Sequence, residues 1–151
     1  MNMKLEILPP YFVAYLRHTG PYGSGNVQIM ERLKAWAKVN HLLDDNAVIL
    51  GIAQDNPETT QPQDCRYDVC LVLSDTSNIS GGDVTLTHLA GGRYAVFTVD
   101  HTAEAVAQAW QVLFPALSEQ GCRPDETRPI LERYAMKMVN SHLCEICVPV
   151  E

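Results

Sequence analysis

Glu132 is a carboxylate in a segment that otherwise alternates like one face of a β-strand. The side chains that share its face are Ile130, Tyr134, Met136 and Met138. An ionised carboxylate is costly to bury unless it is paired, protonated or opposite a ligand that supplies positive charge. A carboxylate among aromatic and methionine side chains therefore suits a pocket for an organic cation.

A structural salt bridge is the alternative role for Glu132, with Arg17 or Arg128 as the partner. An unpaired carboxylate in a low-dielectric setting attracts a cation more strongly than the same group in water. Tyr134 could donate a hydrogen bond to the carboxylate or stack on a ligand. The sequence alone leaves both roles open.

Four further aromatic residues and a methionine are candidate pocket walls. Trp110 and Phe114 are four apart on a predicted helix, so they present one aromatic patch, either to a core or to a ligand. A tryptophan face over a cation contributes on the order of 0.5–2 kcal/mol. Tyr15 and Tyr22 precede the helix predicted in the first half of the chain. They either pack a turn or face the pocket. Met136 would give an adaptable wall, although methionine more often fills gaps in a core.

The cysteines do not indicate a metal or disulfide framework. There are five, an odd number, and Cys144 and Cys147 are three apart in a predicted strand, which directs their side chains to opposite faces. We expect buried free thiols and no metal or other cofactor. The chain also lacks a phosphate-binding glycine loop, a nucleophile elbow or an acidic dyad, so we assign no catalytic residue.

Composition restricts the class of protein. A chain of 151 residues with 46% hydrophobic content can bury its own core, and we expect a single domain over 1–151. A net charge of -7 and a pI near 5.1 argue against direct nucleic-acid binding. No segment is apolar enough for a membrane span or a secretory signal, which predicts a cytoplasmic protein.

Hydrophobic periodicity predicts the same order of elements twice. In the first half, strands are predicted at 4–8, 11–18, 47–53 and 67–73, with a helix at 26–41 capped by Ser24 or Asn26. In the second half, strands are predicted at 84–90, 94–99, 128–139 and 142–148, with a helix capped by Thr102, kinked or interrupted at Pro115 and closed by Gly121.

This repeated order predicts an α+β fold of two pseudo-repeats, at about 1–80 and 81–151. Each unit reads strand-strand-helix-strand-strand and would bury its helix on a largely antiparallel sheet. The concavity between the halves is the expected ligand site.

Several short segments in register resemble one known family. They are 13–15, 17–22, 55–59, 65–70, 91–96, Trp110 with Phe114, and 128–134. Together they resemble the GyrI-like small-molecule-binding domain, which occurs as the DNA gyrase inhibitory protein and as the effector-binding domain of multidrug-sensing transcription regulators. Because no helix-turn-helix segment fits beside these motifs, we expect the free-standing form of the domain.

The resemblance implies a duplicated β-β-α-β fold around a central pocket. In the family, a glutamate on a late strand pairs with lipophilic cations stacked between aromatic rings, and Glu132 in its Glu-x-Tyr context matches it. Leu131 departs from the pattern, because many members carry an aromatic residue there.

Three functional hypotheses follow, and the first is favoured. The protein would bind amphipathic, cationic or aromatic drug-like molecules, with Glu132 as the counter-charge. Alternatively, it would inhibit DNA gyrase through an acidic surface. The third possibility is a hydrolase that opens cyclopropane rings in DNA-alkylating compounds, with Glu132 as general base. The sequence does not indicate the ligand's identity or the oligomeric state.

Overall fold

One antiparallel sheet with two main helices makes up the computed structural model, which describes residues 2–74, 79 and 82–151. The strands are β1 (Met3–Leu8), β2 (Tyr11–Thr19), β3 (Val48–Ala53), β4 (Arg66–Leu73), β5 (Thr85–Leu89), β6 (Gly92–Asp100), β7 (Leu131–Ala135) and β8 (Leu143–Pro149). The helices are α1 (Ser24–Val39), α2 (Ala103–Glu119) and the short α3 (Met136–Val139), with a 3-10 turn η1 (Pro62–Asp64). The predicted α+β fold with duplicated strand-strand-helix-strand-strand units is confirmed.

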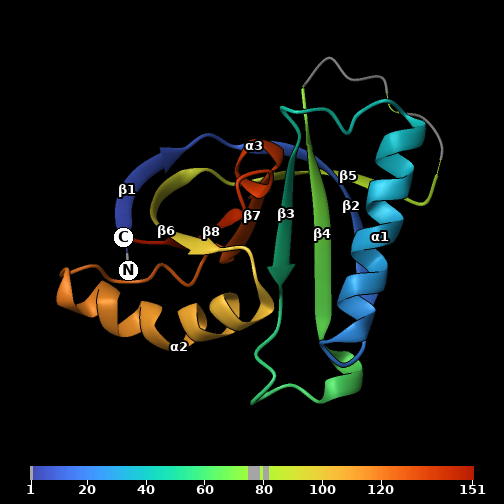
Figure 1. Ribbon diagram of the computed structural model, residues 1–151. Helices are drawn as coiled ribbons and strands as arrows, with labels where there is room; N and C mark the ends of the chain where they lie inside the picture. The colour runs from blue at the N-terminus through green and yellow to red at the C-terminus, as the bar shows by residue number, and fades with distance from the viewer. Residues whose placement is uncertain (1, 75–78, 80–81) are drawn as a thin grey trace.

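The order of strands in the sheet is symmetric between the two halves of the chain. It runs β1-β6-β8-β7-β3-β4-β2-β5, and exchanging β1 to β4 with β5 to β8 reverses this list. The two halves therefore meet at the centre of the sheet, where β3 pairs with β7 (Figure 1). The predicted boundary between the repeats, at 80 and 81, lies outside the described residues and stays a prediction.

The first two strands of each half separate instead of forming a hairpin. β1 pairs with β6, whereas β2 pairs with β4 and β5. The two connections then pass close to each other at Gly91, where a Cβ would lie 2.5 Å from the Leu8 carbonyl oxygen and 2.7 Å from the Pro10 nitrogen. Glycine is needed at this crossing because the neighbouring atoms belong to the backbone and cannot move aside.

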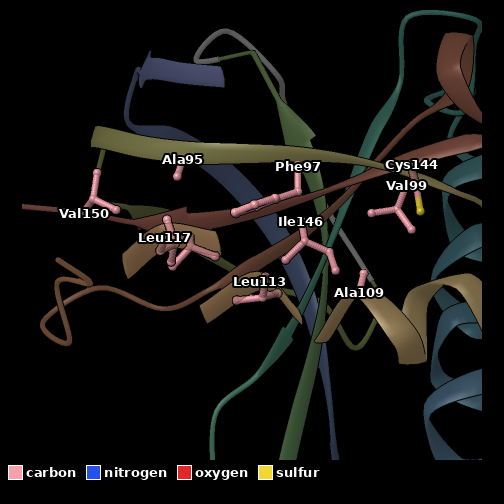
Figure 2. Packing of buried hydrophobic residues seen from close by; sticks show 10 residues of the cluster. Ala95, Phe97, Val99, Ala109, Leu113, Leu117, Cys144, Ile146 and Val150 are labelled. Atoms are coloured by element: carbon pink, nitrogen blue, oxygen red, sulfur yellow. The ribbon is translucent and has the colours of Figure 1, made fainter. Parts of the chain in front are cut away.

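The helices cover one face of the sheet over separate hydrophobic clusters. α2 packs its buried Ala109, Leu113 and Leu117 on β6 and β8, where Phe97 and Ile146 are fully buried (Figure 2). α1 packs on β2, β3 and β4 in the other half. In Figure 1 the two helices accordingly lie over different ends of the sheet. The residues between them carry the candidate site.

The opposite face of the sheet is the inside of a curl. It holds a third cluster that includes Leu50, Val96 and Leu131. Arg133 on β7 crosses this inside to reach Glu6 on β1, 3.1 Å away. β1 and β7 are separated by two strands in the sheet, so a contact between them requires strong curvature.

Three details of the predicted elements are wrong. α1 begins at Ser24 with Gly23 as its N-cap, and glycine has no side chain that could cap the helix. α2 continues through Pro115 without interruption. Pro115 and Gln111 are exposed, so water can satisfy the Gln111 carbonyl that loses its helical partner.

The predicted strand 128–139 is too long, since β7 ends at Ala135 and α3 begins at Met136. Methionine and lysine favour helix, and the Met136 amide is already bonded to the Ala47 carbonyl, 2.9 Å away. By contrast, the cap at Thr102 is confirmed, because its side chain accepts a hydrogen bond from the Ala105 amide.

The cysteines in the last strand point as expected. Cys144 lies in the cluster beneath α2, whereas Cys147 lies in the cluster inside the curl. Cys65, Cys70, Cys144 and Cys147 are buried and Cys122 is half-buried, all as free thiols. Within the described part of the chain, no helix is long and apolar enough to cross a membrane.

Candidate functional site

Glu132 lies at the centre of the sheet, directly opposite Gly51 in the pairing of β7 with β3. Its side chain is on the face that carries the helices, and it is partly open to the space between them. The site is therefore built where the two halves of the chain meet.

A tyrosine from the next strand but one reaches this carboxylate. The Tyr67 hydroxyl on β4 donates a 2.9 Å hydrogen bond to Glu132 Oε1. The bond passes over Gly51 on β3, where a Cβ would collide with the Tyr67 hydroxyl and lie 2.9 Å from Glu132 Oε1. The absence of a side chain at Gly51 thus allows side chains from β4 and β7, the strands on either side of β3, to meet above it.

Burial raises the pKa of the Glu132 carboxyl, while hydrogen bonding from Tyr67, Trp110 and Tyr134 partly opposes the rise. Burial and the neighbouring Glu132 carboxylate also raise the pKa values of Tyr67 and Tyr134. Both tyrosines therefore remain neutral donors. Among the described residues, the hydrogen-bond partners of Glu132 supply dipoles but no compensating positive charge.

The arginines that could have neutralised Glu132 are bonded elsewhere. Arg17 binds Asp68 through two contacts of 2.7 and 2.9 Å. Arg128 binds Asp125 and the carbonyls of Arg93 and Val150. Arg133, although next in sequence, binds Glu145 and Glu6 inside the curl. Within the described residues, the salt-bridge alternative for Glu132 has no arginine partner.

Glu132 lines two adjoining cavities. The loop-side cavity, of about 740 Å³, lies between α2 and the segment 55–58 and is bounded by Gly51, Trp110 and Phe114. The central cavity, of about 710 Å³, lies between the starts of α1 and α2 and is bounded by Tyr67 and Tyr134. Each is large enough for a drug-sized molecule.

A smaller helix-side cavity, of about 230 Å³, extends along α1. It shares Tyr67, Tyr134 and His101 with the central cavity and also contains Met136. The three cavities together form a groove across the sheet, with Glu132 at its middle.

Six of the seven predicted ligand residues border this groove. They are Glu132, Tyr134, Trp110, Phe114, Tyr22 and Met136. Tyr22 borders it as a fixed wall, because its hydroxyl accepts from the Asp55 amide at 3.1 Å and lies 2.9 Å from the Arg66 carbonyl. Tyr15 is on the other face, against the cluster inside the curl and beside Arg17.

The sequence interpretation missed three residues of the site: Tyr67, Gly51 and His101. Gly51 had a readable signal, because an isolated glycine in an apolar strand marks a close approach of other groups. Tyr67 had none, since its role depends on strand order. His101 follows β6, and its ring lies 5.4 Å from that of Tyr134.

The groove can hold an aromatic, positively charged molecule by ordinary interactions. Glu132 supplies the charge, and Trp110, Phe114 and Tyr134 supply faces and edges for stacking. Among the residues that the structure describes, no group of three or more His, Cys, Asp or Glu side chains is placed to hold a metal ion.

These features define a small-molecule-binding domain with a duplicated fold. The model of the GyrI-like small molecule binding domain matches residues 1–151, and the chain belongs to this family. It is 41% identical to the SPbeta prophage-derived protein YosT of Bacillus subtilis (strain 168) over the full length of both. It is 27% identical to DNA gyrase inhibitor 2 of Dickeya dadantii (strain 3937), covering 82% of this chain and 79% of that protein.

Solved structures share the fold. The C-terminal domain of EcmrR superposes with a TM-score of 0.75 at 16% identity, covering 99% of this chain and 97% of that domain. The chain spans 57% of the EcmrR chain in its complex with DNA. SAV2435 bound to tetraphenylphosphonium superposes with a TM-score of 0.61 at 16% identity, covering all of this chain and 94% of that one.

Gly51→Ala tests whether glycine admits the bond between Tyr67 and Glu132. We expect a loss of about 1–3 kcal/mol in the free energy of unfolding, since the added methyl group overpacks the contact between Tyr67 and Glu132. In a Tyr67→Phe background the loss should be smaller, because the colliding hydroxyl is gone. Urea denaturation of the two single variants and the double variant measures this coupling, and additive effects would contradict it.

Glu132→Gln should change how stability depends on pH. A raised pKa in the folded state means that Glu132 contributes stability below its unfolded pKa of about 4.5, and that this contribution is lost as the pH rises through the folded pKa. The glutamine variant should therefore gain stability relative to the wild type as the pH rises through that window. Denaturation at a series of pH values measures the difference.

The exposed variant Glu126→Gln is the control and should follow the wild type across the same range. A difference between Glu132→Gln and the wild type that stays constant or shrinks with rising pH would show that burial does not dominate at Glu132.

Proposed function

We propose that this domain binds amphipathic organic cations in the groove, with aromatic rings of the ligand between Trp110 and the tyrosines and its charge on Glu132. The observation that carries the proposal is that Glu132 lies partly buried at the centre of the groove among neutral donors, with its nearby arginines engaged elsewhere. A ligand cation would supply the missing charge in a low-dielectric setting. In this proposal the site binds the ligand without changing it chemically.

The comparisons support the proposal at the level of the family. A structural neighbour, SAV2435, has been solved with tetraphenylphosphonium, a lipophilic cation. At 16% identity this likeness bears on the fold alone, and in this chain Glu132 and the aromatic walls around it are the features that suit a cation.

Tetraphenylphosphonium should bind to the wild type and lose most of its affinity for Glu132→Gln. We expect a loss of about 30-fold or more, because removing one partner of a buried charge pair costs about 2 kcal/mol or more. The wild-type affinity should fall as the pH drops through the raised pKa of Glu132, because a proton then competes with the cation. Isothermal titration calorimetry measures both effects.

Two controls accompany this measurement. Glu126→Gln removes an exposed carboxylate outside the groove and should bind as the wild type does. Triphenylphosphine oxide keeps three aromatic rings without the charge and should not distinguish Glu132→Gln from the wild type. Equal affinity of tetraphenylphosphonium for Glu132→Gln and the wild type would contradict the pairing of charges.

Inhibition of DNA gyrase is a second candidate function, favoured by the 27% identity to DNA gyrase inhibitor 2. The net charge of -7 suits contact with a basic partner. In this case the exterior of the domain acts, so purified protein should inhibit supercoiling and Glu132→Gln should inhibit equally well. No inhibition at micromolar excess in a supercoiling assay would remove this candidate.

A further inference from the structure

The loop-side cavity is acidic. Its walls carry the carboxylates of Asp55, Glu58 and Glu132, and no lysine or arginine is among the residues that line it. The adjoining central cavity likewise has no lysine or arginine in its lining. A single organic cation at Glu132 would leave Asp55 and Glu58 as further acidic groups of the loop-side cavity.

Asp55 is already neutralised by an arginine from the same half of the chain. Its Oδ1 and Oδ2 each accept a 2.9 Å hydrogen bond from the Arg66 guanidinium, and Oδ2 also accepts from the Arg66 amide at 2.8 Å. These contacts lower the pKa of Asp55 and keep it ionised, with its charge compensated. Asp55 therefore does not need a second cation.

Glu58 is different, because its carboxylate forms no ion pair or hydrogen bond with any residue that the structure describes. Its backbone amide is held by the Asn56 side chain, 2.9 Å away, so the segment that carries it has a defined conformation. Glu58 is exposed at the mouth of the loop-side cavity, whereas Glu132 is on its floor. One cavity of about 740 Å³ thus holds two uncompensated carboxylates with Trp110 and Phe114 in its wall.

The helix-side cavity, at the other end of the groove, carries one charge of each sign in its lining, Glu31 and Lys34. Lys34 lines the helix-side cavity, is half-buried and has no ion-pair partner among the described residues. The helix-side cavity therefore offers no net negative charge to a second cationic group, whereas the loop-side cavity offers Glu58. The charges along the groove therefore favour one direction for a ligand that extends from Glu132.

We propose that the preferred ligands are elongated aromatic dications, which place one cationic group on Glu132 and the other on Glu58 at the mouth of the loop-side cavity. This inference rests on the proposed function, because it assigns the first charge to the same glutamate. Glu132 sets the affinity for any cation, whereas Glu58 sets the preference for two charges over one. The aromatic part between the charges lies along Trp110 and Phe114.

The test uses bis-benzamidines with alkyl linkers of increasing length, each beside its analogue with one amidine replaced by a neutral amide. Calorimetry compares the wild type with Glu58→Gln and with Glu126→Gln, an equally exposed change outside the groove. The best dication should bind more tightly than its single-charge analogue, and Glu58→Gln should remove about two- to fivefold of that advantage, as expected for an exposed ion pair. High salt should reduce the advantage in the same way.

The outcomes separate this inference from the proposed function. If no dication of the series exceeds its analogue, or if Glu58→Gln and Glu126→Gln have the same effect on the dication, the role of Glu58 is overturned. Glu132→Gln should weaken the dication and its analogue alike. If it weakens neither, the proposed function itself fails.

Discussion

The hydrogen bond from Tyr67 to Glu132 across Gly51 is the interaction on which the site depends. It holds a carboxylate at the seam between the two halves while supplying only a neutral donor. A neutral donor orients the carboxylate and lowers the cost of its burial without cancelling its charge. An arginine in the same place would have closed the site to an external cation.

The arrangement of the sheet explains why this interaction can exist. Each half contributes one of the two central strands, so Glu132 from the second half faces Gly51 from the first. Each half also contributes one main helix, and Gly51 and Glu132 lie between the two packing areas, in neither of the core clusters beneath the helices. Tyr134, also at the centre of the sheet, packs against both clusters and so connects them. Both halves of the chain contribute walls to the groove, so one half alone could not form it.

The strand arginines Arg17 and Arg133 lie on the face of the sheet opposite the groove. Alternation along β7 sends Arg133 into the curl, where Glu145 and Glu6 bind it, and leaves Glu132 on the helical face. Arg17 and Asp68 pair on the inner face as well, since Arg17 is opposite Asp68 in the ladder of β2 and β4. Arg17 and Arg133 are therefore bound by partners that do not line the groove.

The sequence predicts the fold well because hydrophobic period, glycine and proline positions and the duplicated order are local signals. It also predicts Glu132, since a carboxylate on an apolar strand face is visible in the alternation itself. Tyr67 could not be found this way, because strand order, a long-range property, decides that β4 lies within reach of β7. Tyr15 was predicted to face the pocket but lies on the other face of the sheet, because the alternation along a strand does not show which of its two faces carries the groove. Met136 borders the groove despite an incorrect strand, because the α3 turn keeps it beside Tyr134.

The most direct measurement is the pKa of the Glu132 carboxyl, followed by carbon-13 NMR of glutamate-labelled protein and assigned by the signal lost in Glu132→Gln. We expect a pKa above the ordinary value in the free protein, because the effect of burial exceeds that of hydrogen bonding. We also expect this pKa to fall markedly when tetraphenylphosphonium is added, because the cation stabilises the ionised form. A pKa at or below the ordinary value that does not move on addition of the cation would contradict it.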